Sequence, residues 1–469
     1  MKDIYPKLEE LSLFEINSTF SYCTALLNRG MKNHIATFDL VVRDMPTNRS
    51  FMVFGGIEEI LNFIENMKYS KKQINILLKT GLIDKEMAKY LKKFKFTGDV
   101  YSMKEGTIFF PGETIIKVRA PIIEANLIHS FLLSSVPSNA VFLTKCTRAK
   151  IAAKGKPVIT NGVRGLGFEV GMKYARAAFI TDMGDLAHLA PSVKYNMPIP
   201  RRPVKAAFHV YMKSFPTEIE AFRTFTNCHP NFDALLLVDT YNFKKGTENA
   251  IIVCKELKKK NKGIAGIFVD SGDLLKNCIY VRKELDNAGL TEVKILAATN
   301  MEEYKIEKLE SQNAPIDSYL AITEMVTCSD YPKLEIIYKM SEIFDGKVAR
   351  PTMKMTPKKR NFPGNKQMYR VIKNGKFEKD IIGLEDEEIK GIPLLHKVMK
   401  RGRIILRTNL QEIRAYAAKE RDILPEHMKV MIPKSKKIPV ELSKNLKKLI
   451  KHQELTVDEK QMLLHSSHF

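Results

Sequence analysis

From about Ala140 onward the sequence alternates between short apolar runs and helical stretches, and this alternation constrains the fold more than any other feature. It is clearest at the apolar runs Ala234–Val238, Ile264–Val269 and Lys294–Ala298. Each run ends at a polar residue and is followed by a stretch with helical character. Such alternation is typical of parallel β/α units, because a helix returns the chain to the start of the next parallel strand. The middle of the chain is therefore expected to consist of parallel β/α units.

Polar residues follow each of these three predicted strands. The sequence Asp239-Thr240-Tyr241 follows the first strand, Asp270-Ser271-Gly272-Asp273 the second and Thr299-Asn300 the third. Carboxylates accept hydrogen bonds from sugar hydroxyls or hold Mg²⁺, and glycine permits close backbone approach. Helix capping explains any one of these ends. Three together favour an active-site rim, because catalytic groups in β/α barrels lie at the carboxyl ends of the strands.

The flanking segments have different patterns. Helical spacing of apolar residues after Gly55-Gly56 predicts a helix that reaches Ile64. Turn signals within Phe96–Ala120 predict a small antiparallel β unit, and Pro121 is expected to open an apolar helix reaching about Ser134. From about Val348 the chain is expected to be irregular, and its last hundred residues to be helical and basic.

Composition restricts the class of protein. A chain of 469 residues with 44% apolar residues is long enough for two domains, or for one domain with a large insertion. The net charge of +23 suits anionic partners, although a lysine-rich coding bias explains it equally well. Six well-separated cysteines argue against a disulfide framework or a zinc site and favour a reducing, cytoplasmic compartment. No apolar run reaches the roughly 18 residues of a membrane span, and the segment MKDIYPKLEE has no secretory h-region.

Two further features are ambiguous when taken alone. His209 lies among apolar residues, where a histidine is more often a packed core residue than a catalyst. The loop Pro363–Arg370 combines glycine with cations, which suits a phosphate. A solvated basic turn explains that loop as well.

Taken together, these segments resemble the nicotinate phosphoribosyltransferase family from near residue 11 to about residue 450. The order and spacing of the motifs are specific for the fold. The stretches that carry the resemblance are Phe96–Tyr101 through Pro111, Pro121–Ala125, Ser214–Glu218, Val238–Tyr241, Asp270–Asp273, Ala314–Asp317, Pro363–Arg370 and Gly383–Asp386.

The resemblance implies an α/β fold with two parts. Residues 141–347 would form an irregular β/α barrel, and residues 1–140 and 348–469 would together form a discontinuous α/β domain with a basic helical tail. Members of the family join nicotinate to phosphoribosyl pyrophosphate in NAD synthesis. They couple the reaction to ATP hydrolysis through a phosphorylated histidine, with help from Mg²⁺. Their site usually lies between the two subunits of a homodimer.

Matching residue by residue, the resemblance implies catalytic roles for His209, Asp270 and Asp239. None of the matched residues is assigned as a metal ligand. Arg164 aligns with the first arginine of the family's FGxRR stretch, which addresses the nicotinate carboxylate and phosphates. The residues expected to bind substrate are Arg164, Asp273, Ser271, Gly272, Asn300 and Thr323.

The sequence departs from the family pattern at several contact positions. In the family's T-D-x-Y-x-x-T-M run, Phe14 replaces the aspartate and Ile16 replaces the tyrosine that stacks on the pyridine ring. The second arginine of FGxRR is Gly165. The G-T-S-N, G-T-x-A-H and G-V-G-T patterns are altered at Gly184–Ala187, Lys205–His209 and Leu320–Thr323. The framework motifs are therefore better kept than the contact residues.

Three hypotheses follow from this pattern. The first, preferred for the length of the resemblance, is a divergent nicotinate phosphoribosyltransferase. The second is a non-catalytic member that serves as a binding or assembly module, with nucleic acid as one anionic partner, although no RNA-binding motif supports it. The third is a phosphoribosyltransferase for another base.

Overall fold

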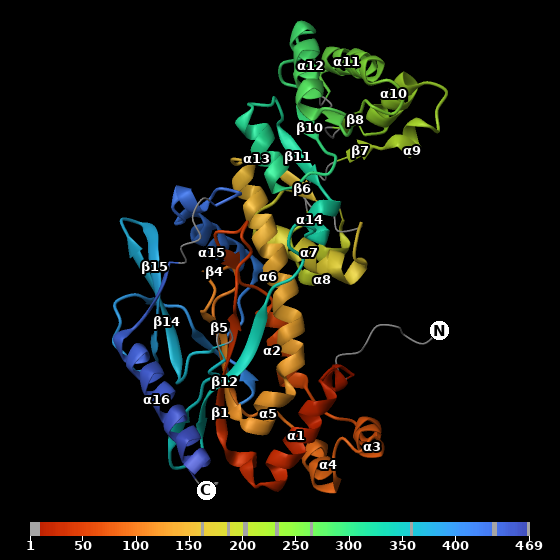
Figure 1. Cartoon of the computed structure of the whole chain (residues 1–469). Helices are drawn as coiled ribbons and strands as arrows, with labels where there is room; N and C mark the ends of the chain where they lie inside the picture. Colours follow the sequence, from red (N-terminus) through yellow and green to blue (C-terminus); the bar gives the residue numbers. More distant parts are fainter. Residues whose placement is uncertain are drawn as a thin grey trace. The chain divides into compact units, whose positions relative to one another are not determined.

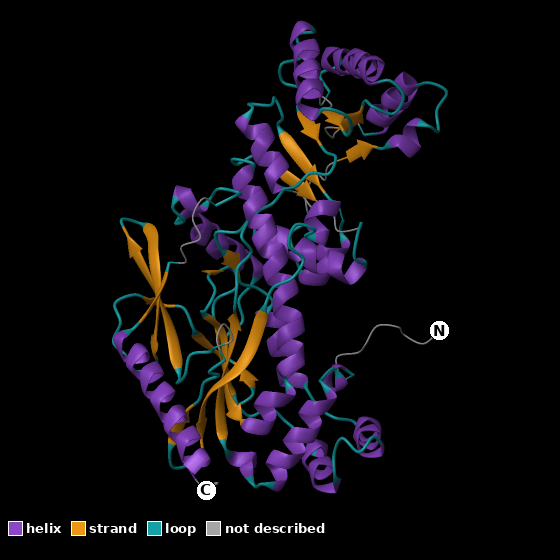
Figure 2. Ribbon diagram, in the orientation of Figure 1, coloured by secondary structure: helices purple, strands orange, loops and turns teal. Residues whose placement is uncertain are grey.

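The computed structural model describes residues 10–160, 164–184, 188–199, 205–229, 234–262, 266–356, 360–433 and 439–466, with side chains described as far as residue 455. The chain divides into two compact units (Figures 1 and 2). Unit 1 comprises Met1–Val141, Lys333–Met428 and Ile432–Phe469, and unit 2 comprises Phe142–Pro332 with Lys429–Met431. The chain passes from the first unit to the second within a long helix, α6 (His129–Ala152).

Unit 2 is built on a six-stranded sheet with the order β6-β11-β10-β9-β8-β7. All the pairs of neighbouring strands are parallel. Among the described residues no pairing joins β6 to β7, so the sheet is an open, curled part of a barrel. Its strands are β6 (Val158–Thr160), β7 (Lys205–Ala207), β8 (Ala234–Leu237), β9 (Gly266–Val269), β10 (Ile295–Ala297) and β11 (Ser318–Ala321).

The core of unit 2 explains why its strands read as continuous apolar runs. Five of the six strands each contribute a residue to one buried cluster, and Ala298 completes it. A parallel sheet is covered on both faces, so its strands lack polar alternation. The five residues are Ile159, Leu237, Phe268, Leu296 and Leu320.

Helices alternate with these strands along the chain, as predicted. In the structure, α12 packs on β9 and β10, while α10 packs on α11 (Figure 1). The helices of unit 2 after α6 are α7 (Phe168–Ile180), α8 (Ala190–Tyr195), α9 (His209–Met212), α10 (Glu218–Cys228), α11 (Phe243–Lys259), α12 (Leu274–Asn287), α13 (Glu303–Ser311) and α14 (Thr323–Thr327).

Unit 1 contains a seven-stranded sheet of order β13-β12-β1-β5-β3-β17-β18, a four-stranded sheet of order β16-β14-β15-β19, and the pair β2-β4. The small antiparallel unit predicted for Phe96–Ala120 is confirmed, because β3 pairs with β5 in antiparallel fashion. The strands are β1 (Ile35–Val42), β2 (Met52–Val53), β3 (Asp99–Ser102), β4 (Ile108–Phe109), β5 (Thr114–Pro121), β12 (Ile336–Phe344), β13 (Ala349–Pro351), β14 (Lys366–Lys373), β15 (Lys376–Leu384), β16 (Ile392–Pro393), β17 (His396–Lys400), β18 (Arg403–Ile404) and β19 (Val440–Leu442).

The helices of unit 1 include the one predicted up to Ile64, which spans Ile57–Asn66. Those described are α1 (Asn17–Asn28), α2 (Ile57–Asn66), α3 (Lys71–Lys79), α4 (Lys85–Lys92), α5 (Ile122–Leu127), α15 (Leu410–Asp422) and α16 (Lys444–Ser466), with short 3₁₀ turns at Leu11–Leu13, Met31–Asn33 and Glu426–Met428.

Three expectations are corrected by these elements. The helix expected from Pro121 to Ser134 is two helices, because Ile128 separates α5 from α6, and α6 continues to Ala152. The segment after Val348 is not mainly irregular and then helical, since β14 to β19 lie within it. Residues 333–347, assigned to the barrel from the sequence, belong to unit 1, because β12 pairs along the whole length of β1.

No helix in the described part of the chain is both long enough and apolar enough to cross a membrane.

Candidate active site

The carboxyl ends of the six parallel strands carry polar residues predicted from the sequence, in one continuous series. Because parallel strands end at the same edge of a sheet, these residues share one rim. In order across the sheet, Arg164 follows β6, Thr323 follows β11, Asn300 follows β10, Asp270 follows β9, Asp239 follows β8 and His209 follows β7.

Asp270 is influenced by several other residues of this rim. Burial raises the pKa of its carboxyl group, and a hydrogen bond from Thr299 opposes that rise. The negative charge of Asp239 raises the pKa further, whereas the charges of His209 and Arg164 lower it. Asp239, His209 and Arg164, which follow three other strands of the sheet, therefore all lie within electrostatic range of Asp270.

Asp239 has an unusual environment. Both of its carboxylate oxygens are buried, and neither has a hydrogen-bond partner among the described residues. The neighbouring Glu218, at the start of α10, is also buried, and its pKa is raised by burial and by the charge of Asp239. An unsatisfied buried carboxylate is costly, so its retention points to a ligand that supplies positive charge or hydrogen-bond donors.

His209 is the first residue of α9 and is partly exposed, so it is not the packed core residue that its apolar neighbours indicated. Its neighbours Phe208 and Val210 are exposed as well. The Nδ1 atom of His209 lies 3.2 Å from Oγ1 of Thr240, at the end of the adjacent strand. A contact of this kind orients the imidazole ring through its Nδ1 atom.

The run Ser271-Gly272-Asp273 forms an exposed turn before α12. Asp273 is the N-cap of that helix and accepts a hydrogen bond from the amide of Lys276 at 3.2 Å. Gly272 has φ of +74°, and a Cβ atom there would lie 2.9 Å from Nδ2 of Asn277, so the turn requires glycine. The turn thus keeps the carboxylate of Asp273 at the surface of the rim.

Asn300 and Thr323 lie where the sequence predicts, at the ends of β10 and β11. Asn300 is exposed, and Thr323 is the half-buried first residue of α14. The side chain from the end of β10 that touches Asp270 is that of Thr299, whose hydroxyl donates to Oδ1 at 3.1 Å. Thr299 was not among the predicted site residues, although the polar strand end Thr299-Asn300 indicated this position.

The structure shows the surroundings of several residues that depart from the family pattern. In unit 1, Phe14 and Ile16 are 55% and 54% exposed on either side of the buried Glu15, which the amide of Ser130 holds at 2.8 Å. In unit 2, Gly165 has φ of +124°, and a Cβ atom there would lie 2.9 Å from a methyl carbon of Thr327. An arginine at Gly165 would therefore require a different backbone. The altered residues Asp185–Ala187 lie outside the described residues.

The segment Pro363–Arg370 contributes buried ion pairs to unit 1, which neither interpretation of its sequence predicted. The amine of Lys366 is buried 2.7 Å from a carboxylate oxygen of Asp39. The guanidinium of Arg370 is buried too, and it pairs with Asp380 through two hydrogen bonds, at 3.0 and 2.7 Å, and with Glu420. These two cations are therefore engaged in internal ion pairs rather than in a phosphate loop or a solvated turn.

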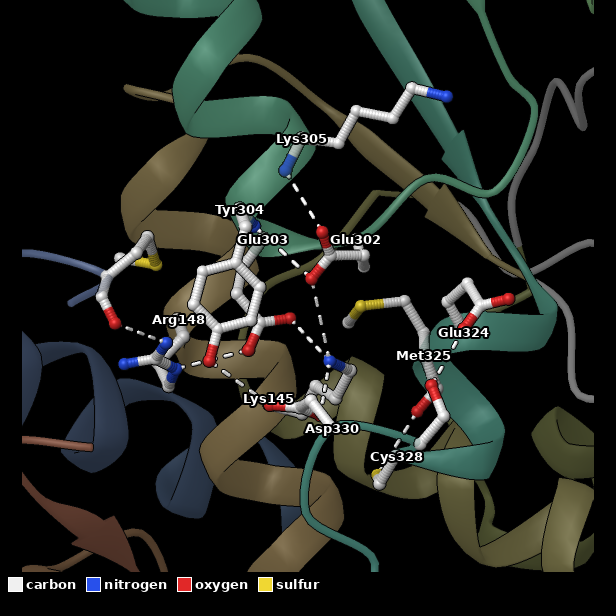
Figure 3. Close-up of polar contacts among 12 residues, drawn as sticks. Lys145, Arg148, Glu302, Glu303, Tyr304, Lys305, Glu324, Met325, Cys328 and Asp330 are labelled. Atoms are coloured by element: carbon white, nitrogen blue, oxygen red, sulfur yellow. Dashed lines mark hydrogen bonds and ion pairs between the residues drawn. The ribbon is translucent and has the colours of Figure 1, made fainter. Parts of the chain in front are cut away.

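Unit 2 also contains a buried ionic network that was not predicted from the sequence (Figure 3). The amine of Lys145 lies 2.7 Å from Glu303 and 2.8 Å from Asp330, and Arg148 binds the other oxygen of Glu303 at 3.1 Å. The network connects α6 with the start of α13 and with the segment after α14. It braces the loops that leave the ends of β10 and β11.

Comparisons with known proteins agree with this architecture. Residues 18–137 match the model of the nicotinate phosphoribosyltransferase (NAPRTase) N-terminal domain. The chain is 30% identical over 411 residues to the nicotinate phosphoribosyltransferase pncB2 of Mycobacterium tuberculosis, covering 87% of this chain and 86% of that protein. It is 31% identical over 396 residues to the nicotinate phosphoribosyltransferase of Bacillus subtilis, covering 82% and 78%.

Solved structures show the same fold. The crystal structure of human nicotinic acid phosphoribosyltransferase aligns with a TM-score of 0.79 at 18% identity, covering 93% of this chain and 99% of the other. A nicotinate-nucleotide pyrophosphorylase from Pyrococcus furiosus aligns with a TM-score of 0.72 at 21% identity, covering 90% and 99%. With a parallel sheet of this kind and relatives at this identity over most of the chain, the protein belongs to the nicotinate phosphoribosyltransferase family.

Proposed function

We propose that this protein transfers the phosphoribosyl group of phosphoribosyl pyrophosphate to nicotinate, giving nicotinate mononucleotide and pyrophosphate. The observation that carries the proposal is that Asp239, His209 and Arg164 all act electrostatically on Asp270, on one rim, in a chain of this family. The reaction needs cationic groups for a highly charged leaving group, together with groups that orient the ribose toward the ring nitrogen.

Arg164 is proposed to bind the nicotinate carboxylate or a phosphate, because a guanidinium is suited to paired hydrogen bonds with such groups. Asp270 and Asp273 are proposed to accept hydrogen bonds from the ribose hydroxyls. The exposed turn of Ser271 and Gly272 leaves room for close approach of the sugar phosphate. Asn300 and Thr323 extend the same rim over the neighbouring strands and are proposed to bind substrate.

The residues on this rim fit Mg²⁺. Magnesium is usually bound by one or two carboxylates together with substrate phosphates and water. Asp239 supplies two buried oxygens without hydrogen-bond partners among the described residues, and the charge of Asp270 acts on the same region. We therefore propose that Asp239, with Asp270, holds the Mg²⁺ that arrives with phosphoribosyl pyrophosphate. The ion would neutralise charge on the pyrophosphate leaving group.

His209 is proposed to accept the γ-phosphoryl group of ATP with ADP as the leaving group, and hydrolysis of the phosphohistidine would then release phosphate. Its partly exposed ring is oriented by Thr240 through Nδ1, so Nε2 is the nitrogen proposed to attack. A histidine at the rim that binds the substrate could couple ATP hydrolysis to the binding of that substrate.

A second copy of the chain is proposed to complete the site. Large apolar side chains are exposed after the carboxyl ends of β6, β7 and β8, where a monomer would leave them in water. Exposed apolar surface of this kind is typical of interaction sites. The side chains are Leu166, Phe168, Phe208, Val210 and Tyr241.

The proposal is tested by incubating the purified protein with nicotinate, phosphoribosyl pyrophosphate and Mg²⁺, with and without ATP, and measuring nicotinate mononucleotide. The variant Arg164→Ala should raise the KM for nicotinate at least tenfold. The control variant Arg223→Ala should not, because Arg223 is an exposed residue of α10 that pairs with Glu256 of α11. Product from another base, and none from nicotinate, would favour a different phosphoribosyltransferase. The similarity to named nicotinate phosphoribosyltransferases gives the binding-module alternative no support.

A further inference from the structure

We propose that Lys305, which lies outside the predicted set of site residues, is a positioning residue for Asp270 and acts through Thr299. The inference rests on the proposed function, in which Asp270 orients the ribose. Lys305 lies in the first turn of α13, two residues after the helix begins, whereas Thr299 lies two residues after the end of β10. The two residues form the end points of a short loop that the side chain of Lys305 closes.

The backbone of that loop is strained. Thr299 has φ of +81° and Asn300 has φ of +44°. Positive φ is costly for residues other than glycine, and especially for a β-branched residue such as threonine. Such conformations persist only where the surrounding structure enforces them, and they cluster at functional sites. Something must therefore hold the loop in this state.

Lys305 supplies a restraint of that kind. Its half-buried amine donates a hydrogen bond to the carbonyl oxygen of Thr299 at 2.6 Å. A bond to a charged donor is stronger than one between neutral groups. Burial lowers the pKa of the amine, and the nearby charge of Glu302 opposes that effect, which favours the charged form of the donor.

The loop's other end is anchored to the buried network (Figure 3). Glu302 is the N-cap of α13 and accepts hydrogen bonds from the amides of Lys305 and Tyr304, at 3.1 and 3.3 Å. A carboxylate oxygen of Glu302 also lies 3.9 Å from the amine of Lys145. Lys305 thus projects from a helix end that is itself fixed, so its amine can hold Thr299 in place.

The position of Thr299 matters because its hydroxyl touches Asp270. The hydroxyl donates to Oδ1 of Asp270 at 3.1 Å and also contacts the main-chain carbonyl of that residue. A relaxed loop would take this donor away and leave the carboxylate without its fixed orientation. Lys305 therefore affects the orientation of the Asp270 carboxylate indirectly, by holding the backbone of Thr299 in place.

Two variants distinguish the contact between Lys305 and the Thr299 carbonyl from the contact between the Thr299 hydroxyl and Asp270. Thr299→Ala removes the hydroxyl but keeps the carbonyl that Lys305 binds. It should lower kcat/KM by roughly tenfold to a hundredfold, with little change in hydrogen exchange of the peptide 298–303. Lys305→Met should lower kcat/KM to a similar extent and should also raise that exchange. Lys305→Arg should restore much of both properties, because it keeps a cationic donor.

The double variant Lys305→Met/Thr299→Ala tests whether both act through one contact. Its kcat/KM should be no lower than that of the worse single variant, since effects carried by one contact do not multiply. Lys308→Met, on an exposed lysine of the same helix, is the matched control and should behave as the unaltered protein.

Multiplying effects in the double variant, or a Lys305→Met enzyme as active as Lys308→Met, would overturn the inference. If the unaltered protein shows no turnover at all, the proposed function fails instead. In that case the exchange measurement still tests the restraint, since unchanged exchange in Lys305→Met would show that Lys305 does not hold the loop.

Discussion

The imidazole of His209 is tied to the hydroxyl of Thr240 by a contact of 3.2 Å that joins the ends of neighbouring parallel strands. A histidine that accepts a phosphoryl group must present one nitrogen consistently. The contact with Thr240 achieves this by occupying Nδ1. The proposed ATP-dependent residue, His209, therefore connects the end of β7 to the end of β8.

Replacing Thr240 with valine should impair that step selectively. Without the hydroxyl the ring is free to turn, so incorporation of labelled γ-phosphate from ATP should fall by about tenfold, the effect of losing one hydrogen bond. Thr240→Ser keeps the hydroxyl and serves as the control. Equal labelling of the valine and serine variants would contradict the orienting role.

Replacing Asp239 with asparagine should stabilise the protein while it damages catalysis. The change removes a buried charge whose oxygens lack hydrogen-bond partners in the described structure, and it removes a repulsion felt by Glu218 and Asp270. We expect the free energy of unfolding to rise by on the order of 1 kcal/mol without ligands. The stabilisation that Mg²⁺ and phosphoribosyl pyrophosphate give the unaltered protein should shrink, as measured by thermal denaturation.

The control for this change is Asp286→Asn, at an exposed carboxylate that accepts from Arg282 on the same helix. It should leave both stability and ligand response nearly unchanged, because exposed ion pairs contribute little. A less stable Asp239→Asn protein would show that Asp239 has a structural partner.

Asp273 is expected to have two separable roles. Asparagine caps helices as well as aspartate does, so Asp273→Asn should keep the stability of α12 while it weakens binding of phosphoribosyl pyrophosphate. Asp273→Ala should lose the binding and also about 1 kcal/mol of stability. Urea denaturation and the KM for phosphoribosyl pyrophosphate distinguish the two effects. An unchanged KM for phosphoribosyl pyrophosphate in both variants would show that Asp273 acts only as a helix cap.

Glu124 should make the stability of unit 1 depend on pH near neutrality. Burial raises the pKa of this carboxyl group to about 7, although the amide and hydroxyl of Thr97 donate hydrogen bonds that lower it. Because the folded pKa exceeds the ordinary value of 4.5, the folded state binds more protons between these values. Stability is therefore greatest below about pH 4.5 with respect to this group, and it falls as pH rises toward 7.

Glu124→Gln removes that dependence while it keeps an oxygen that can accept from Thr97. Above pH 7 the variant should be more stable than the unaltered protein, by on the order of 3 kcal/mol at most. Near pH 4.5 the two should be similar. Urea denaturation at several pH values measures the difference, and parallel profiles for the two proteins would refute the assignment.

The sequence predicted the rim because its signal is local. Each strand is a run of apolar residues that stops at a polar one, so Asp239 and Asp270 could be located without knowledge of their neighbours. The contacts that connect the rim could not be located in this way. The hydroxyl of Thr299 and the carboxylate of Asp270 are 29 positions apart, and they meet only because β9 and β10 are adjacent.

The same reasoning explains the errors in unit 1. The strand β14 contains the buried cations Lys366 and Arg370, which read as exposed basic residues in the sequence. Their burial depends on Asp39 and Asp380, each supplied by another strand. A charge that is neutralised by a distant partner carries no local sign of its burial, so a basic loop was expected where a strand is found.

The most direct test of the account is the product formed from nicotinate and phosphoribosyl pyrophosphate by the purified protein, in the presence of Mg²⁺ and ATP. We predict nicotinate mononucleotide and pyrophosphate in equal amounts, and loss of at least a hundredfold in kcat/KM in Asp270→Asn, in line with the loss of a group that orients the reactants. The absence of product at saturating concentrations, together with no detectable binding of phosphoribosyl pyrophosphate, would contradict the account.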